Sequence, residues 1–350
     1  MPRLWDTLGS WEEIVRTQTP KGDARVIDHL VGIVTNEEVH IDARRRALGL
    51  ACALADDKQA PRLLDTFMTF LKVRDLLDDP KPLDEGLFQS AQARLYGAFA
   101  YGVLNHLKPL LSDQRAILDV VTASYILGGT GMAREGELCV AQPRGFFDPI
   151  KSCEAPLELR QEAVCRIIAK GWRRGVSEEI QFQLPDYPEL LDPVIFPRLR
   201  ELVRAENTPD RFHWGAAEIL SFLGDTEILS DLEARRAPFR AVHTYHEEAI
   251  MRYIWRIQVQ HPPTQLLEYI ASVGWPLQRD RRAWAVCRAL SLGIPPAQIR
   301  EAILKHHKRV KTRDERVDLD ELKWLGLELG ILKKDDMPDV DIASGPKVST

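Results

Sequence analysis

The sequence predicts an all-α protein, an irregular α-solenoid in which helical hairpins stack on one another. Apolar residues recur at steps of three and four along most of the 350 residues, which is the period of one face of an α-helix. Several of these stretches are rich in alanine and end at a Gly-Asp or Asp-Asp pair, which lets neighbouring helices pack closely and then turn. The alternative is a non-repetitive fold of many helices.

The first predicted helix begins at Asp23. Val26, Ile27, Leu30 and Val34 fall on one stripe, as expected of a helix with one buried face. The same periodicity predicts further helices over residues 37–56, 60–77, 83–111 and 113–127. Prolines at positions 80 and 82 follow the helix predicted over 60–77 and end it, because proline cannot continue a helix.

Residues 128–156 interrupt the helical pattern with eight glycines and prolines. We expect a linker or a long ordered loop there, with a short strand near Leu138-Cys139-Val140. A helix over 157–171, a proline-rich lapse over 184–197 and four or five further helices to about Leu332 follow. The predicted domains are therefore an N-terminal helical region (1–127), the loop or linker (128–156), a C-terminal helical region (157–336) and a flexible tail (337–350).

Residues 210–232 form the clearest repeat unit. Ala216 and Ala217 permit close helix approach, apolar residues follow, and Gly224-Asp225 ends one helix and starts the next. This segment resembles a HEAT-like repeat of the short kind first described in phycobilisome lyases, and weaker copies occur at residues 42–56, 159–171 and 280–293. Because such repeats bury their faces only against their neighbours, the resemblance implies an α-solenoid of HEAT-like helical hairpins.

Composition narrows the class of protein. The formal net charge of −5 lacks the basic excess typical of nucleic-acid binding, so nucleic acid is disfavoured as a partner. No stretch approaches the ~18 apolar residues of a membrane span, and the N-terminus has no cationic stretch leading into an apolar run. The five cysteines are far apart and odd in number, which predicts buried free thiols. We therefore expect a cytoplasmic protein without a membrane partner.

One histidine-rich segment raises the question of a metal site. His243, His246 and Glu247 lie close in the sequence, and HEAT-like di-iron hydroxylases use repeated His-Glu pairs as ligands. This chain has a single such pair, and two neighbouring ligands do not specify a metal. A polar helix start is the favoured interpretation, and no cofactor is expected.

A cluster of acids precedes the prolines at 80 and 82. Asp75, Asp78 and Asp79 resemble the Asp-rich Mg²⁺ motif of terpene cyclases, whose carboxylates bind diphosphate through magnesium. The second metal motif of that family is not evident here. A helix end followed by a polar turn is the favoured interpretation.

Basic groups at residues 44–46, 172–174, 279–282 and 305–311 suggest a different surface. Facing one groove, they would bind phosphates, as in the HEAT-like alkylpurine DNA glycosylases that share this predicted architecture. The alternative is that they pair with neighbouring acids, since Asp314 and Glu315 closely follow Lys311.

The function predicted from these patterns is a non-catalytic scaffold or adaptor that binds a protein partner on a curved helical surface. Tryptophan and arginine are favoured at interfaces and recur together near the repeat helices. The predicted contact residues are Trp172, Arg173, Arg211, Trp214, Arg252, Trp255, Arg281 and Trp284. Two alternatives stay open: a nucleic-acid binder or glycosylase-like enzyme, and a His/carboxylate metalloenzyme.

Overall fold

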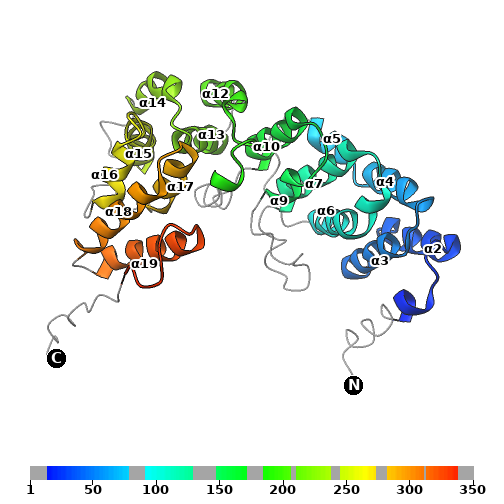
Figure 1. Ribbon diagram of the computed structural model, residues 1–350. Helices are drawn as coiled ribbons and strands as arrows, with labels where there is room; N and C mark the ends of the chain where they lie inside the picture. Colours follow the sequence, from blue (N-terminus) through cyan, green and yellow to red (C-terminus); the bar gives the residue numbers. More distant parts are fainter. Residues whose placement is uncertain are drawn as a thin grey trace, which may run out of the picture. The chain divides into compact units, whose positions relative to one another are not determined.

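The computed structural model describes residues 14–78, 91–128, 147–171, 184–205, 210–237, 245–272, 282–310 and 313–337. Every regular element within these ranges is helical, which confirms the predicted all-α class. The chain divides into two compact units, residues 1–176 and 177–350 (Figure 1). This boundary differs from the predicted one, because the helix at 157–171 packs with the N-terminal helices.

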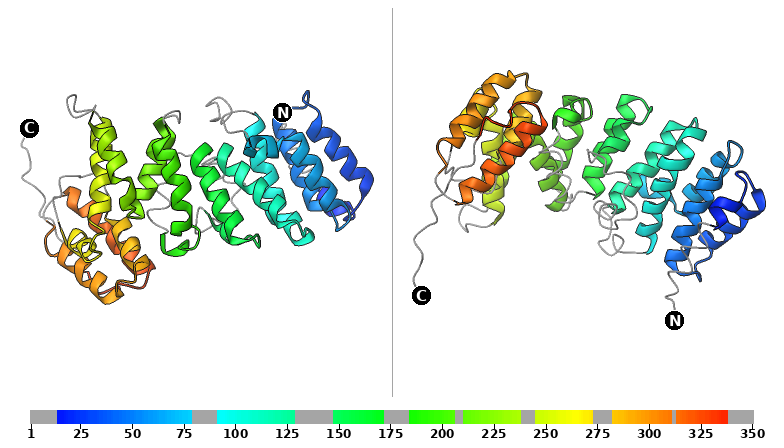
Figure 2. Two further views of the ribbon diagram at one scale, coloured as in Figure 1. Left: turned by 90° about the horizontal axis from the view of Figure 1, so that it is seen from above. Right: turned by 60° about the horizontal axis from the view of Figure 1, so that its bottom comes forward.

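Unit 1 is built from helices that pack in chain order. Contacts join α2 to α3, α3 to α6, α6 to α7 and α7 to α10, and these helices lie side by side in both views of Figure 2. Its elements are α2 (Ala24–Thr35), α3 (Ile41–Leu54), α4 (Gln59–Phe70), α5 (Val73–Asp78), α6 (Ala91–Gly102), the π-helix η2 (Val103–Leu107), the 3-10 helix η3 (Lys108–Leu110), α7 (Gln114–Gly128), α9 (Asp148–Lys151) and α10 (Leu157–Gly171).

A local sequence signal explains the start of α2, whereas the break between α4 and α5 depends on a backbone turn. The Asp23 carboxylate caps α2 by accepting hydrogen bonds from the first-turn amides, and Ile27, Leu30 and Val34 of the predicted stripe are buried, whereas Val26 is half-buried. The helix predicted over 60–77 is instead two helices, because the backbone turns at Lys72, where φ is 54°. The Tyr96 hydroxyl of α6 donates a hydrogen bond to the carbonyl of Leu71 at this turn.

Gly102 permits the close approach of α6 to α3. A Cβ at this position would lie 2.7 Å from Sγ of Cys52, far inside van der Waals contact. Cys52 is buried, and burial raises the pKa of its thiol to about 12, so the thiol stays protonated. The four described cysteines are free and buried, as predicted.

The predicted loop or linker at 128–156 is described only from residue 147. There the chain forms α9 and packs against α7 and α10. Phe147, Ile150, Cys153 and Ala155 are all buried, so this end of the segment belongs to the core of unit 1 and is not a linker. The predicted strand at 138–140 lies outside the described residues.

Unit 2 contains the remaining helices. Helix α13 packs against α12 and α15, α15 packs against α14, and α16 to α19 form a further group in mutual contact. Its elements are the 3-10 helices η4 (Leu184–Asp186), η5 (Pro193–Ile195) and η6 (Thr226–Ile228), with α12 (Phe196–Arg204), α13 (Asp210–Phe222), α14 (Leu229–Arg236), α15 (Tyr245–Gln258), α16 (Gln265–Ala271), α17 (Ala283–Ser291), α18 (Pro296–His307) and α19 (Arg313–Glu328).

The segment that resembled a repeat folds locally as its residues predict. Ala216 and Ala217 are buried in α13, which ends at Phe222, and Gly224 in the turn that follows has a positive φ of 71°. A Cβ on Gly224 would lie 2.6 Å from the Gln260 side chain, so only glycine fits. Asp225 then caps η6 through a hydrogen bond from the Glu227 amide. The predicted tail lies outside the described residues from 338 onward.

Candidate functional site

A cleft in unit 1 is a concave feature of the described surface that is lined by charged side chains. Its volume is about 310 Å³, at the lower end of the range of small-ligand pockets. It is lined by Arg74, Leu77, Asp78, Arg115, Asp119 and Arg166. These residues come from α5, α7 and α10, and α7 contacts both of the other helices.

Each of these three helices contributes an arginine and an acid at a spacing of four residues. Side chains at this spacing lie on one face of a helix, one turn apart. The pairs are Arg74 with Asp78, Arg115 with Asp119, and Glu162 with Arg166. The packing of α5 and α10 on α7 therefore brings three charged faces to one place.

Lys170 fixes α5 against α10 next to the cleft. Its ammonium nitrogen donates hydrogen bonds of 2.6 and 2.8 Å to the carbonyls of Leu76 and Leu77, and its side chain is largely buried. A cation at this position satisfies carbonyls at the C-terminal end of α5 that have no partner within the helix. The position of Asp78 at the end of α5 therefore depends on Lys170.

The three arginines of the cleft differ in their partners. Arg166 lies 3.7 Å from a carboxylate oxygen of Asp78 and 3.5 Å from one of Glu162, so both are loose ion pairs. The guanidinium groups of Arg74 and Arg115 are exposed and form neither a hydrogen bond nor an ion pair with any part of the chain that the structure describes. Two cationic groups at the cleft are therefore available to a ligand.

Asp119 is the half-buried acid of the cleft. Its burial raises the pKa of the carboxyl above the ordinary value of 3.8, and the nearby negative charge of Asp78 acts in the same direction. Arg115, Arg166 and Arg74 oppose this effect without cancelling it. Asp119 consequently holds a proton more readily than an exposed aspartate does.

The cleft continues as a narrower space between α7 and α10. This space has a volume of about 20 Å³, enough for a water molecule, and the Thr122 and Glu162 side chains line it together with Asp119. Asp119 therefore shares this space with the polar side chains of Thr122 and Glu162.

One predicted contact residue requires a correction. Trp284 has no exposed surface, and its ring packs against Phe222 at 5.8 Å and Tyr269 at 6.0 Å between ring centroids. Its size and apolar surface, which suggested an interface anchor, are used in the core of unit 2. Trp284 is therefore removed from the candidate contact surface.

The other predicted contact residues separate into two groups. Trp214, Arg252 and Trp255 are half-buried on α13 and α15, where Trp214 stacks on His246 at 5.6 Å and Trp255 meets Tyr269 edge-on at 4.6 Å. Trp172, Arg173 and Arg281 lie outside the described residues, as does the side chain of Arg211. Tyr269 thus contacts both Trp255 and Trp284. The predicted contact residues that the structure describes, apart from Trp284, are partly buried side chains.

The candidate metal ligands are engaged in other contacts. Glu247 is buried and lies 3.4 Å from the Arg236 guanidinium, and His246 stacks on Trp214. His243 lies outside the described residues. Among the residues with described positions, no group of three or more His, Cys, Asp or Glu side chains has a metal-binding arrangement.

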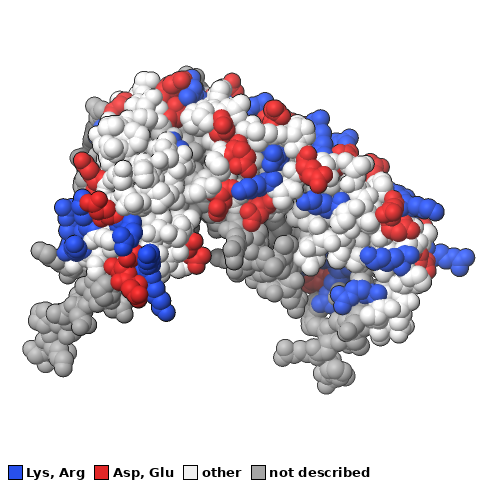
Figure 3. All heavy atoms as spheres, viewed as in Figure 1, with Lys and Arg blue, Asp and Glu red and all other residues white. Residues whose placement is uncertain are grey.

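Several of the predicted basic groups are paired within the protein. Arg44 donates to the Val34 carbonyl, Arg282 pairs with Asp318, and Lys305 pairs with Glu301. Lys and Arg side chains are interspersed with Asp and Glu on the visible surface in Figure 3. These contacts favour the ion-paired alternative over a phosphate-binding groove for these groups.

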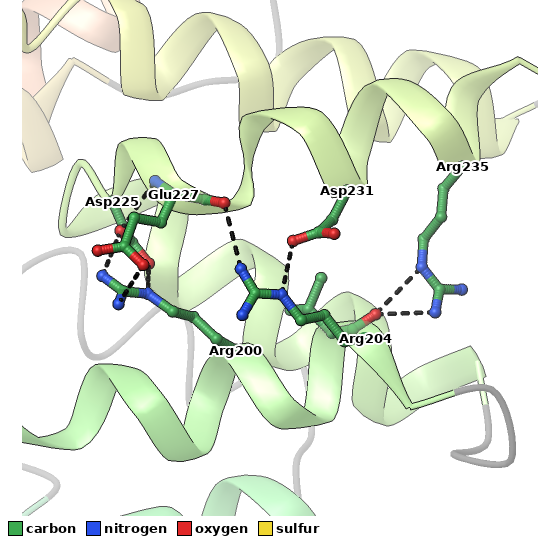
Figure 4. A network of polar contacts seen from close by, with 7 residues as sticks. Arg200, Arg204, Asp225, Glu227, Asp231 and Arg235 are labelled. Carbon is green, nitrogen blue, oxygen red and sulfur yellow. Dashed lines mark hydrogen bonds and ion pairs between the residues drawn. The ribbon is translucent and has the colours of Figure 1, made fainter.

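Arginines on α12 and α14 in unit 2 illustrate complete pairing (Figure 4). Arg200 donates two hydrogen bonds of 2.7 Å to the carboxylate of Asp225 and also pairs with Glu227. Arg204 donates a 2.9 Å bond to Asp231, and Arg235 donates two bonds to the Val203 carbonyl. We call these six side chains the arginine clasp; it joins α12 to the segment that follows α13.

Sequence reasoning identified only one member of the cleft, Asp78, and assigned it to an unrelated acidic motif. Arg74, Arg115, Asp119 and Arg166 were not singled out. The available signal was the repeated spacing of an arginine and an acid by four residues on three helical stretches, which are not consecutive in the chain. That signal becomes informative only when helix packing shows that the three faces meet.

Comparisons with known proteins add no relative. No family model matches the chain, and neither a curated protein nor a solved structure matches it significantly. Within the described residues, no helix has both the length and the apolar character that crossing a bilayer requires.

Proposed function

We propose that this chain is a non-catalytic binding protein, a scaffold or adaptor, that holds a protein partner through an acidic group placed in the cleft of unit 1. The observation that carries the proposal is the pair of exposed guanidinium groups, Arg74 and Arg115, that line a cleft and have no partner in the described chain. Arginine is favoured at interfaces because its planar fork binds carboxylates and phosphates through two parallel hydrogen bonds.

The proposed architecture behind this function is an α-solenoid of HEAT-like hairpins. Its support is the chain-order packing of α2, α3, α6, α7 and α10 in unit 1, together with the Gly224-Asp225 boundary in unit 2. In such an array each added hairpin extends the surface without changing the core, so an interface can grow along the chain.

The half-buried side chains of Trp214, Arg252 and Trp255 are proposed as a second, weaker contact region. Each already packs or bonds within unit 2 and exposes only part of its surface. A partner that covers these side chains would gain less than one that pairs the unsatisfied arginines of unit 1.

The test is affinity capture from a lysate of the source cells with the full chain as bait, followed by titration of the captured protein. The double variant Arg74→Ala/Arg115→Ala should weaken binding of that protein at least tenfold, because each arginine bond to a charged group contributes about 1.5–3 kcal/mol. The matched control is Arg25→Ala/Lys58→Ala, which removes the same charge from exposed positions of unit 1 outside the cleft.

Three results would contradict the proposal. One is the absence of any partner whose binding depends on the chain. Another is a partner that binds the cleft double variant and the wild type equally. The third is an equal loss of binding in the control variant, because this would indicate a general charge effect and not recognition in the cleft.

A further inference from the structure

The charged groups of the cleft, Asp119 included, balance when all are ionised. Arginines at positions 74, 115 and 166 carry three positive charges, and the acids at 78, 119 and 162 carry three negative charges when all are ionised. Protonation of Asp119 alone leaves one excess positive charge. The attraction of this cleft for an anion therefore depends on a single proton.

The three guanidinium groups are arranged for an anion with oxygens on several sides. They reach the cleft from three different helices, α5, α7 and α10, and not from one helix face. A tetrahedral phosphate or sulfate group presents oxygens in several directions, whereas a carboxylate presents two in one plane. A protonated Asp119 would add a hydroxyl donor to the same lining.

We propose that the cleft of unit 1 binds a phosphate monoester group and takes up a proton on Asp119 when it does so. This inference rests on the proposed function, since it names the acidic group that the cleft receives. The free phosphorylated small molecule and the phosphorylated side chain of a partner share this chemistry, and the experiment below separates them.

The proton linkage follows from the surroundings of Asp119. The charged groups that face it are Arg115 on α7 itself, Arg74 and Asp78 on α5, and Arg166 and Glu162 on α10. Of the other elements packed on α7, α6 carries Arg94, η2 carries His106, and α9 carries Asp148 and Lys151, and none of these groups is among the causes of the shift in the pKa of Asp119. An anion held between the arginines adds negative charge beside Asp119 and raises its pKa further, so binding and proton uptake strengthen each other.

The described contacts also argue against a cation as the occupant. Any cation in the cleft would face Arg74 and Arg115, whose charges no carboxylate neutralises by direct contact. The carboxylates of Asp78 and Glu162 both lie beside the Arg166 guanidinium. The acidic residues are thus partly neutralised while two arginines stay available.

Calorimetric titration of the full chain with sodium sulfate tests the linkage. Sulfate stays a dianion throughout the range used, so a change in its affinity with pH reports a group on the protein. We expect the affinity to fall between about pH 5 and about pH 7.5, by up to about tenfold for each pH unit, the limit for uptake of one proton. The variant Asp119→Asn keeps a neutral side chain and should bind sulfate with the same affinity at both pH values.

Two further variants make the assignment specific. Arg115→Ala should reduce sulfate affinity about tenfold or more at the lower pH, because it removes a charged hydrogen-bond donor. Asp57→Asn, an exposed acid of unit 1 outside the cleft, should leave both the affinity and its pH dependence unchanged. Far-ultraviolet circular dichroism of each variant establishes that it is folded.

The source of the phosphate is separated by two ligands, free phosphoserine and the acetylated peptide Ala-Ala-pSer-Ala-Ala. Tighter binding of the peptide supports a phosphorylated protein segment, and equal or tighter binding of phosphoserine supports a small phosphorylated molecule; each result supports a phosphate site. Absence of binding by sulfate and both phosphate ligands, or pH dependence retained in Asp119→Asn, overturns the inference.

Failure of the inference and failure of the proposed function give different results. If a captured partner requires Arg74 and Arg115 but neither phosphate nor sulfate binds, the phosphate site is rejected and the proposed binding function stands. If phosphate binds but no partner is captured, the adaptor function is rejected and the phosphate site stands. A duplex oligonucleotide that binds more tightly than phosphoserine at equal salt would overturn the monoester assignment in favour of nucleic acid.

Discussion

Two arginines of the cleft in unit 1, Arg74 and Arg115, have the same chemistry as the arginines of the clasp in unit 2 and the opposite pairing. In the clasp, Arg200 binds the buried carboxylate of Asp225 through two short hydrogen bonds, and each arginine has a partner. In the cleft, Arg74 and Arg115 have none within the described chain. An arginine paired inside the protein stabilises the fold, whereas one left unpaired beside a concave surface is available for recognition.

The difference in arginine pairing arises from the positions of the acidic residues. Asp225 is placed by the turn after α13, where it also caps η6, so it meets Arg200 of the preceding helix with little freedom. In unit 1 the acids lie one turn away from the arginines on the same helices, and burial raises the pKa of the half-buried Asp119 above its ordinary value. Loss of a clasp residue should therefore change stability, and loss of a cleft residue should change binding.

The largest expected effect is on the clasp. Asp225→Ala should lower the free energy of unfolding of unit 2 by about 3 kcal/mol, because it leaves the largely buried Arg200 without its main partner and removes the cap of η6. Urea unfolding followed by tryptophan fluorescence measures this, since the buried Trp284 belongs to unit 2. A loss below about 1 kcal/mol would show that the clasp is not structural.

A smaller effect is expected at a glycine of unit 1. Gly102→Ala should destabilise unit 1 by about 1–3 kcal/mol, because the new methyl group would overlap Sγ of Cys52 in the seam between α3 and α6. Thermal unfolding followed by far-ultraviolet circular dichroism measures it, with Gly97→Ala as the control, since a Cβ there meets no neighbour. Equal destabilisation in both variants would remove the steric explanation.

At low pH, protonation of one aspartate in each unit should change the stability of the two units in opposite directions. The pKa of Asp336 is lowered to about 2 by its hydrogen bonds from Arg300 and from the Lys333 amide. Its contribution to the stability of unit 2 is therefore present above the ordinary value of 3.8 and is lost as the pH falls toward 2. Asp336→Asn should flatten this part of the profile, and an unchanged profile would contradict the assignment.

Asp119 should act in the opposite direction. Because its pKa is raised in the folded protein, unit 1 is stabilised at low pH relative to a protein with an ordinary aspartate, and this contribution is lost as the pH rises from 3.8 through the raised pKa. Asp119→Asn should remove that dependence and leave unit 1 at least as stable as the wild type at neutral pH. A marked loss of stability there would show that the charged carboxylate is needed for folding.

The smallest effect on stability is expected for the more exposed ion pair of the clasp, which serves as a control for the buried one. Asp231→Ala breaks the pair with Arg204, whose side chain is half exposed, so the free energy of unfolding should change by less than about 1 kcal/mol. The same urea experiment measures it beside Asp225→Ala. Equal losses in the two variants would indicate that burial does not determine the strength of these pairs.

Helix periodicity and turn residues predicted much of the fold, whereas the site depended on packing. The helix start at Asp23, the burial of Ile27, Leu30 and Val34, and the Gly224-Asp225 boundary follow from local signals, and the structure confirms each. The break at Lys72 and the packing of residues 147–155 depend on contacts with distant helices, which no local window contains.

The predicted contact residues show the same limit of local information. A tryptophan that anchors an interface and one that fills a core have the same sequence signal, and Trp284 is of the second kind. Conversely, Arg74, Arg115 and Arg166 are ordinary helix-surface arginines in the sequence. They become a candidate site only because α5 and α10 both pack on α7.

The most direct test of the contrast between cleft and clasp is the urea unfolding of Arg74→Ala/Arg115→Ala, with and without sulfate at about pH 5. Without sulfate, the free energy of unfolding should stay within about 0.5 kcal/mol of the wild type, since neither guanidinium is paired in the described chain. Because sulfate stabilises folded proteins in general, the free energy of unfolding should rise more in the wild type than in the variant at the same sulfate concentration. A variant that loses stability as Asp225→Ala does, or that sulfate stabilises as much as the wild type, would contradict this account.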